Sequence, residues 1–327
     1  MKLLVIGGTE FVGRAFVETA APAHDVTVFH RGRTEPDGLP PVEHVHGDRD
    51  GGVSLLDGRS FDAVIDTCGY VPRVVADAVT RLADRADRYL FVSTLSVYPD
   101  DTPPGADESA ETYGSPFPDT EDVTGESYGP LKTSCENEVV EAVDGRALIV
   151  RPGYIVGPND PTDRFTAWVR RAAGGDEMLV PGPRDERLQV IDVRDLGWFM
   201  LHLLGSGATG VFNAVGPGEP LTMGAFIDAA VRIGGAGTEP VWVDRDFAMA
   251  LGDEDERYRM FPMWHPDATG VHAWSTERAV VAGLRHRRFD ETVRDTLEWD
   301  RARAQAPLAF GLRPDEEREL LKRWRAP

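Results

Sequence analysis

Short apolar runs alternate with helical segments through the amino-terminal half of the chain, and this alternation constrains the fold more than any other feature. Most of the runs are continuously apolar, as expected for parallel strands that are buried on both faces. We predict strands at 2–6, 25–29, 42–46, 63–66, 89–93 and 147–151, with helices at 11–20, 71–84 and 131–143. The pattern predicts an α/β fold with a doubly wound parallel sheet, in which the carboxyl ends of the strands share one ligand-binding edge.

The stretch IGGTEFVGR, residues 6–14, lies between the first predicted strand and the first predicted helix. In a Rossmann-type unit this turn binds a dinucleotide, because backbone N–H groups at the helix start contact the phosphates. Gly7 and Gly13 take the first and last positions of a Gly-x-x-Gly-x-x-Gly pattern, whereas Glu10 replaces the middle glycine. We expect the carboxylate of Glu10 to turn outwards while its backbone stays on the ligand side. The predicted cofactor contacts in this loop are Gly7, Thr9, Glu10, Phe11 and Val12.

Basic residues follow the second predicted strand, where His30, Arg31 and Arg33 form the stretch HRGR. Proteins that prefer NAD usually place an acidic residue there to bind the ribose hydroxyls, whereas arginine matches a 2′-phosphate. The sequence therefore favours NADP(H) as cofactor, with NAD(H) as the alternative. Asp48, in GDRD, is predicted to accept the adenine amino group, and Gly69, in DTCGY, to allow close approach of the cofactor.

Tyr128 and Lys132 lie four residues apart on a predicted helix, so their side chains share one face. A tyrosine that acts as an acid or base near neutral pH needs a pKa lowered from about 10, and a neighbouring ammonium lowers it by favouring the phenolate. Upstream, the fifth predicted strand ends in Ser93, Thr94 and Ser96, whose hydroxyl groups can bind a substrate oxygen. These residues predict acid/base catalysis by Tyr128.

The glycine loop is followed along the chain by STLSVY, YGPLK, RPGYIVGP and VIDVRDLG. This order resembles the extended short-chain dehydrogenase/reductase superfamily, and within it the NAD-dependent epimerase/dehydratase family, over residues 1 to about 215 and loosely beyond. The stretches GGTEFVGR, HRGR and GDRD further resemble atypical members related to chloroplast stem-loop-binding proteins. The resemblance implies a Rossmann-type nucleotide domain and hydride transfer to or from a nicotinamide.

The resemblance also implies roles for individual residues. Thr94, Tyr128 and Lys132 would be catalytic, and Lys132 would also bind the nicotinamide ribose. The backbone around Tyr154 would pack on the nicotinamide. The substrate contacts that it implies are Ser96, Arg187 and Gln189.

Three reactions of the family start from this constellation. An epimerase returns the hydride to the other face of a sugar nucleotide or similar small molecule, and a reductase stops after one transfer. A dehydratase places Asp-Glu directly after the threonine, where this chain has Leu95 and Ser96, so we disfavour dehydration. The alternatives are an NADP-dependent carbonyl reductase of a non-sugar metabolite and a non-catalytic atypical member that binds the cofactor for regulation.

We expect two domains. Residues 1–155 and about 187–215 would form the dinucleotide-binding domain, and about 156–186 and 216–327 a smaller mixed α/β substrate-binding domain. The acidic stretch 99–127 is interpreted as a long loop that is either functional or mobile, with a disordered acidic surface loop as the alternative. The aromatic and methionine cluster in YRMFPMWHPDATG is interpreted as core of the second domain more readily than as a pocket.

The composition limits the partners. A formal net charge of −20 repels nucleic-acid phosphates, so we expect a small-molecule substrate and no nucleic acid. We find no apolar run long enough to span a membrane and no signal segment, and we expect a cytoplasmic protein. Cys68 and Cys135 form no metal-type spacing, and we predict no metal site. Relatives often dimerise through two helices, here 71–84 and 131–143, so a homodimer is the expected assembly.

Overall fold

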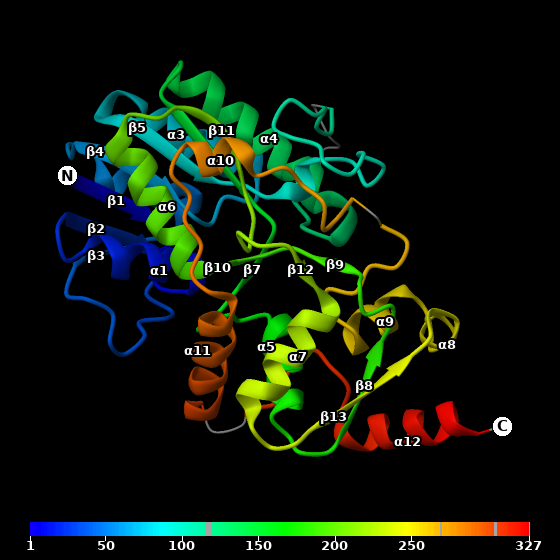
Figure 1. Cartoon of the computed structure of the whole chain (residues 1–327). Helices are drawn as coiled ribbons and strands as arrows, with labels where there is room; N and C mark the ends of the chain where they lie inside the picture. The colour runs from blue at the N-terminus through cyan, green and yellow to red at the C-terminus, as the bar shows by residue number, and fades with distance from the viewer. Residues whose placement is uncertain (115–119, 269, 304–305, 327) are drawn as a thin grey trace. The chain divides into compact units, whose positions relative to one another are not determined.

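A computed structural model of the chain describes residues 1–114, 120–268, 270–303 and 306–326. The chain forms two compact units, and Figure 1 labels many of their helices and strands. The amino-terminal unit comprises Met1–Gly153, Val193–Val215 and Trp274–Arg285. The carboxy-terminal unit comprises Tyr154–Asp192, Gly216–Ala273 and His286–Pro327. No helix within the described ranges is both long enough and apolar enough to cross a membrane.

The amino-terminal unit is built on a seven-stranded sheet in the order β11-β6-β5-β4-β1-β2-β3, with all neighbouring strands parallel. The strand order reverses between β1 and β4, which is the switch point where such sheets bind ligands. This topology confirms the predicted doubly wound parallel sheet. The strands are β1 (Lys2–Ile6), β2 (Asp25–His30), β3 (Glu43–His46), β4 (Phe61–Asp66), β5 (Ala86–Val92), β6 (Ala147–Pro152) and β11 (Gly210–Ala214).

Helices cover both faces of this sheet. Helix α1 (Phe11–Ala20) packs against α6 (Val193–Ser206), and α3 (Pro72–Leu82) packs against α4 (Gly125–Val143). Right-handed crossovers that leave β1 and β4 in opposite directions place these two pairs on opposite faces. The side chains of β1 from Leu3 onwards are all buried, as the continuous apolar run predicts. Two shorter helices complete the unit, α2 (Arg49–Gly52) and α10 (Glu277–Val281).

The connection between β5 and α4 is long and has no regular helix or strand in the described residues from Pro99 to Thr124. Several hydrogen bonds nevertheless hold it to the amino-terminal unit. The N–H of Tyr113 donates to the carbonyl of Val97 (2.9 Å), and the carboxylate of Glu108 accepts from the N–H of Asn213 (2.7 Å). The part of this segment around Tyr113 is therefore anchored to the end of the sheet.

In its described residues the carboxy-terminal unit contains three separate strand pairs and six helices, a mixed α/β arrangement as predicted. The parallel pairs are β7 (Tyr154–Val156) with β10 (Val190–Asp192) and β8 (Glu177–Pro181) with β13 (Glu239–Val243), and the antiparallel pair is β9 (Arg187–Leu188) with β12 (Leu221–Thr222). The helices are α5 (Arg164–Ala172), α7 (Met223–Gly234), α8 (Arg245–Met249), α9 (Glu254–Met260), α11 (Phe289–Ala302) and α12 (Pro314–Arg325).

Aromatic side chains fill the core of this unit. Phe165 on α5 stacks on Phe226 on α7 with ring centroids 4.7 Å apart, and Phe289 meets both rings edge-on. Aromatic and methionine residues of YRMFPMWHPDATG belong to the same core. This confirms the interpretation of that stretch as core of the second domain. Its buried members are Met260, Phe261, Met263 and Trp264.

The two units differ from the expected domains at two places. The strands β9 and β10 pair with β12 and β7, so residues 187–192 belong to the carboxy-terminal unit. Conversely, the segment Trp274–Arg285 joins the amino-terminal unit. There Trp274 stacks on Tyr98 with centroids 4.7 Å apart, and the Thr276 hydroxyl donates to the carbonyl of Asn213 (3.2 Å).

Candidate active site

The turn after β1 has the backbone shape that the glycine loop predicts. Gly7 and Gly8 have φ angles of +103° and +90°, in the left-handed region that favours glycine. A Cβ on Gly7 would overlap the hydroxyl of Thr67, and one on Gly13 would overlap the backbone of Gly8. The loop after β1 and the first helical turn of α1 can therefore pack this closely only with glycine at these positions.

Glu10 occupies the position just before α1. Its carbonyl accepts the first helical bond, from the N–H of Arg14 (3.1 Å), but its side chain does not cap the helix. Instead the exposed carboxylate accepts a hydrogen bond from the hydroxyl of Thr34, 3.1 Å away in the β2–β3 loop. Phe11, the first helical residue, has a φ of +34°, which is rare outside glycine. The loop thus directs the Glu10 side chain away from the uncapped start of α1.

The three basic residues after β2 have different surroundings. His30 is buried, and its pKa is lowered by burial first and by the neighbouring His44 and His46 next. Arg31 and Arg33 are exposed, and neither makes a hydrogen bond or ion pair with the described part of the chain. Their guanidinium groups are therefore available to an anionic ligand.

Asp48 is exposed and caps a short helix. Its side chain accepts a hydrogen bond from the N–H of Asp50 (3.1 Å) and so caps the short helix α2. Its predicted contact with adenine stays a prediction.

A buried ion pair that the sequence analysis missed supports the turn after β4. Arg49 donates two hydrogen bonds to the carboxylate of Asp66, at 2.7 and 2.8 Å, and Tyr89 donates a third at 3.0 Å. The same carboxylate accepts the N–H of Cys68 at 3.2 Å, next to the predicted cofactor residue Gly69. The sequence signal is a charged residue, Asp66, directly after the apolar run Ala63–Ile65 of β4. The pair fixes the backbone that leads into Gly69.

Lys132 is buried, and its ammonium joins the carboxyl ends of two strands to α4. It donates to the carbonyl of Gly69 at 2.8 Å and to the carbonyl of Val92 at 2.6 Å. It also lies 4.1 Å from the centroid of the Phe91 ring. Burial is the main cause that lowers its pKa, to about 8. A Cβ on Gly69 would lie 2.5 Å from the Phe91 ring, so glycine permits this close approach.

Tyr128 and Thr94 reach the same end of β5. Tyr128 is half-buried one helical turn before Lys132. Its neighbour Gly129 packs directly on the carbonyl of Ser96, where any Cβ would overlap. Thr94 is buried, and its hydroxyl accepts from the N–H of Ser96 (3.1 Å) and donates to the Ser96 hydroxyl (3.2 Å). The structure thus brings α4 against the Thr94–Ser96 turn.

Helix α4 begins at Gly125, earlier than predicted, because a capping box starts it. The Thr124 hydroxyl accepts from the N–H of Ser127 (3.2 Å), and the Ser127 hydroxyl accepts from the N–H of Thr124 (2.8 Å). Tyr128 therefore lies in the first turn of α4, whereas the predicted helix began only at residue 131.

The remaining predicted residues lie in the carboxy-terminal unit. Tyr154 is on β7, Arg187 is exposed on β9, and Gln189 follows β9, where its N–H donates to the His272 ring (3.1 Å). Their contacts with cofactor and substrate stay predictions.

Tyr154 belongs to a buried polar cluster that the sequence analysis did not identify. Its hydroxyl lies 2.6 Å from Nε2 of His265 and 3.2 Å from the hydroxyl of Tyr258. The guanidinium of Arg164 lies over the Tyr154 ring, 4.8 Å from its centroid. Burial is the main cause that lowers the pKa of His265, to about 4, with electrostatic contributions from His272 and Arg164, so this ring is neutral at pH 7.

Comparison with known proteins identifies the class. A sequence model of the NAD dependent epimerase/dehydratase family matches residues 3–216. The chain belongs to this family, whose name specifies a nicotinamide cofactor. No curated protein matches the chain.

Solved structures share the fold at low sequence identity. The UDP-glucuronic acid 4-epimerase from Bacillus cereus, in complex with NAD, has a TM-score of 0.69 at 14% identity and covers 93% of this chain and 100% of its own. The Bordetella bronchiseptica enzyme WbmH, in complex with NAD+, has a TM-score of 0.69 at 16% identity and covers 92% and 98%. The UDP-N-acetylglucosamine 4-epimerase from Bacillus cereus has a TM-score of 0.67 at 15% identity and covers 94% and 99%. At these identities the likeness establishes the fold.

Proposed function

We propose that this chain transfers hydride between a nicotinamide dinucleotide and a secondary alcohol or ketone of a sugar nucleotide or similar small molecule, with Tyr128 as acid/base. The observation that carries the proposal is the buried ammonium of Lys132. It is fixed at the ends of β4 and β5, one helical turn after Tyr128. Family membership supplies the cofactor class and the reaction type.

The residues around the switch point fit a dinucleotide. The turn at Gly7 and Gly8 has positive φ angles and leads into a helix start that the Glu10 side chain does not cap, which suits a pyrophosphate. The same loop continues through Thr9, Phe11 and Val12, and Asp48 and Gly69 follow at the ends of β3 and β4. When bound, the nicotinamide supplies the site that accepts or returns a hydride.

Lys132 has one donor left for this ligand. An ammonium carries three N–H donors, and two of them bind the carbonyls of Gly69 and Val92. We propose that the third binds the nicotinamide ribose. The charge also favours the phenolate form of Tyr128, one turn away on the same helix face.

Tyr128 moves the proton in this scheme. Its hydroxyl takes the proton of the substrate alcohol, or returns it to a substrate ketone, at the substrate oxygen. The Thr94 hydroxyl donates to Ser96 in the structure, and we propose that it turns to donate to the same substrate oxygen. Ser96 completes this side of the site.

Epimerisation of a sugar nucleotide is the reaction that we favour. The fold neighbours named above include 4-epimerases of UDP-glucuronic acid and UDP-N-acetylglucosamine, which supports the substrate class. Leu95 and Ser96 replace the acidic pair that a dehydratase places after the threonine, which argues against dehydration. The second candidate is an NADP-dependent reductase, and the unpaired guanidinium groups of Arg31 and Arg33 favour it.

Two measurements test this proposal. Nucleotide released from denatured, freshly purified protein is identified by mass spectrometry, because an epimerase retains its cofactor whereas a reductase exchanges it. Epimerisation of UDP-glucuronic acid and UDP-N-acetylglucosamine is then followed with the wild type and Tyr128→Phe.

We expect Tyr128→Phe to lower kcat by about 10²- to 10⁴-fold. The matched control is Tyr70→Phe, which keeps the ring beside Lys132 and removes the hydroxyl of a residue that is 45% exposed. Full activity of Tyr128→Phe would refute the assigned acid/base.

A further inference from the structure

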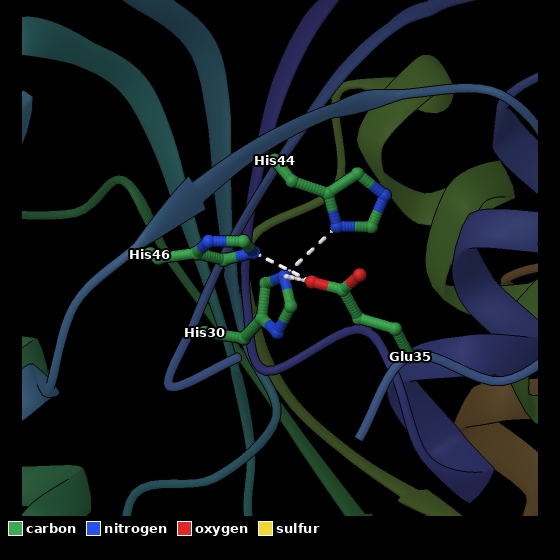
Figure 2. Close-up of side chains that lie close together, drawn as sticks. All are labelled: His30, Glu35, His44 and His46. Atoms are coloured by element: carbon green, nitrogen blue, oxygen red, sulfur yellow. Dashed lines mark hydrogen bonds and ion pairs between the residues drawn. The ribbon is translucent and has the colours of Figure 1, made fainter. Parts of the chain in front are cut away.

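Three histidines and a glutamate gather at the free edge of the central sheet. His30 ends β2, His44 and His46 lie on the edge strand β3, and Glu35 comes from the loop between them (Figure 2). His30 is buried, whereas the other three side chains are exposed to solvent. The cluster is therefore anchored on the sheet and open to ions in solution.

The pairing of β2 and β3 determines the positions of the three histidines. His30 and His46 are directly paired in the parallel register of β2 and β3. His44 lies two residues before His46, and residues two apart on a strand share one face. The three rings therefore lie on one face of the sheet, with centroids 5.0 Å apart for His30 and His44 and 4.8 Å for His30 and His46.

The ligand atoms converge on one point. Nε2 of His30 lies 2.8 Å from Nδ1 of His44 and 3.8 Å from Oε1 of Glu35. That glutamate oxygen lies 2.6 Å from Nε2 of His46. One ligand atom from each of the four residues lies within 4.8 Å of every other. In a tetrahedral site with zinc–ligand bonds of about 2.0–2.1 Å, the ligand atoms lie about 3.3 Å apart, which falls inside this range of separations.

We propose that His30, Glu35, His44 and His46 bind a divalent transition-metal ion, with zinc the best match. Three imidazole nitrogens and one carboxylate oxygen form a set that zinc accepts, whereas magnesium and calcium prefer oxygen ligands throughout. Four protein ligands fill a tetrahedral shell and leave no position for a substrate. The site is therefore structural, and it clamps the loop that carries Glu35 onto β2 and β3.

The facing nitrogen atoms of His30 and His44 suit a shared metal ion. Nε2 of His30 and Nδ1 of His44 lie 2.8 Å apart, and the hydrogen bond between them uses the lone pair of only one of the two nitrogens. A single metal ion satisfies both nitrogens, together with His46 and Glu35. The net charge of −20 also favours cation binding over the whole surface.

Metal binding has a local consequence for the loop. The N–H of Gly32 points at Nδ1 of His30 across 3.3 Å, which requires Nδ1 to be unprotonated. A neutral histidine that binds metal through Nε2 carries its proton on Nδ1. The hydrogen bond from Gly32 is therefore lost on metal binding, and the Gly32 amide becomes a spectroscopic marker of occupancy.

The test uses full-length protein without an affinity tag, stripped of metal by a chelator and dialysed. Zinc is titrated in competition with a chromogenic chelator, and cobalt(II) is titrated separately to read the coordination geometry from its visible spectrum. We expect one zinc per chain, a tetrahedral cobalt spectrum, a raised thermal unfolding midpoint with zinc, and a shift of the Gly32 amide resonance.

Variants locate the site. His44→Ala/His46→Ala is expected to lose zinc binding and the cobalt spectrum, and Glu35→Gln to weaken both. The matched control is His202→Ala, which removes a histidine that stacks on Trp198 on α6, away from the cluster. Circular dichroism of each apo variant establishes that it folds, and Glu35→Gln changes only an exposed loop side chain.

The proposal is overturned if the stripped wild type binds no zinc in stoichiometric amount. It is equally overturned if the double histidine variant binds zinc as tightly as the wild type, or if the cobalt spectrum is octahedral. None of these readouts depends on enzymatic activity, so the outcome is independent of the proposed function.

Discussion

The ammonium of Lys132 donates a hydrogen bond of 2.8 Å to the carbonyl oxygen of Gly69, a residue 63 positions earlier in the chain. This bond connects the helix that carries Tyr128 to the turn after β4, where the cofactor is proposed to bind. It also buries a charge, because Lys132 is shielded from solvent on all sides. The state of this one ammonium therefore affects both the stability of the amino-terminal unit and the proposed chemistry.

Lys132 is expected to titrate near pH 8, below the ordinary lysine value of 10.5, because burial disfavours its charged form. The chain has three lysines, and Lys2→Arg/Lys322→Arg leaves Lys132 as the only one. The side-chain resonances of isotope-labelled lysine in this variant report the titration directly. A midpoint at the ordinary value would show that the ammonium is solvated and not buried as described.

The lowered pKa of Lys132 also predicts how the stability of the protein depends on pH. Between about pH 8 and pH 10.5 the unfolded chain holds the proton that folded Lys132 has released, so unfolding takes up a proton. The contribution of Lys132 to the free energy of unfolding therefore rises with pH through this window and is lost as the pH falls through about 8. Urea unfolding of wild type and Lys132→Met at several pH values isolates the contribution. A difference between the two proteins that stays constant over this window would contradict the linkage.

Lys132→Met is also expected to lower kcat by at least about tenfold, because the phenolate of Tyr128 loses its nearest positive charge. The optimum of the remaining activity should move to higher pH, which a purely structural role for Lys132 would not cause. The measurement is the pH profile of kcat and of kcat/KM, with the amount of bound cofactor determined for each preparation. An unshifted profile would remove Lys132 from the proposed mechanism.

The strands and the first turn could be predicted because their signals are local. The ends of β1 and α1 were predicted correctly, since a continuous apolar run, Gly7 and a helical pattern follow one another directly. The start of α4 was missed, because Gly125 and Pro130 suggest a loop and the capping box at Thr124 outweighs them. β11 was missed because it gains its strand conformation by pairing with β6, far away in the sequence.

In the candidate site, too, the sequence predicts local features but not contacts between distant segments. Tyr128 and Lys132 are recognisable from a spacing on one helix, and that spacing is preserved in the structure. The contact of Gly129 with Ser96 and the pair of Arg49 with Asp66 join distant segments, so no local pattern predicts them. The histidine cluster is a similar case, because the HVH pattern is visible in the sequence but the position of His30 beside His46 depends on strand register.

Asp66→Asn is expected to destabilise the protein by about 3–5 kcal/mol, because it leaves the buried guanidinium of Arg49 without its counter-charge. The matched control is Asp62→Asn on the same strand, an exposed carboxylate that accepts the N–H of Lys2 (2.7 Å). Asp62→Asn should lower the free energy of unfolding by about 1 kcal/mol or less. Chemical unfolding of both variants provides the comparison, and equal losses would mean that the Arg49–Asp66 pair adds no special stability.

The basic residues after β2 predict the choice of cofactor. Wild type should bind NADPH more tightly than NADH, and Arg31→Ala/Arg33→Ala should weaken NADPH binding about tenfold or more, since a hydrogen bond to a charged group contributes about 1.5–3 kcal/mol. NADH affinity should change little. Arg85→Ala, which removes a surface arginine paired with Asp57, is the control for lost positive charge. Tighter binding of NADH by the wild type would exclude the 2′-phosphate role.

Glu10 is the residue of the glycine loop that most needs a test. Its carboxylate accepts a hydrogen bond from Thr34 and does not cap α1, so the structure gives it no part in holding the phosphate turn. Glu10→Gln should leave cofactor affinity equal or better, because it removes a negative charge near the pyrophosphate. Glu10→Gly should do the same and lower the free energy of unfolding by about 0.5–1 kcal/mol, from the added backbone freedom of glycine.

Thr34→Val separates the two possible roles of this carboxylate, because it breaks the contact with Glu10 while leaving the charge in place. Calorimetric titration of each variant with NADPH and NADH gives the affinities, and urea unfolding gives the stabilities. If Glu10→Gln loses most of its cofactor affinity while Thr34→Val retains it, then Glu10 contacts the cofactor directly, as an acceptor for a ribose hydroxyl. If both variants lose affinity equally, the hydrogen bond holds the β2–β3 loop in the conformation that the cofactor requires.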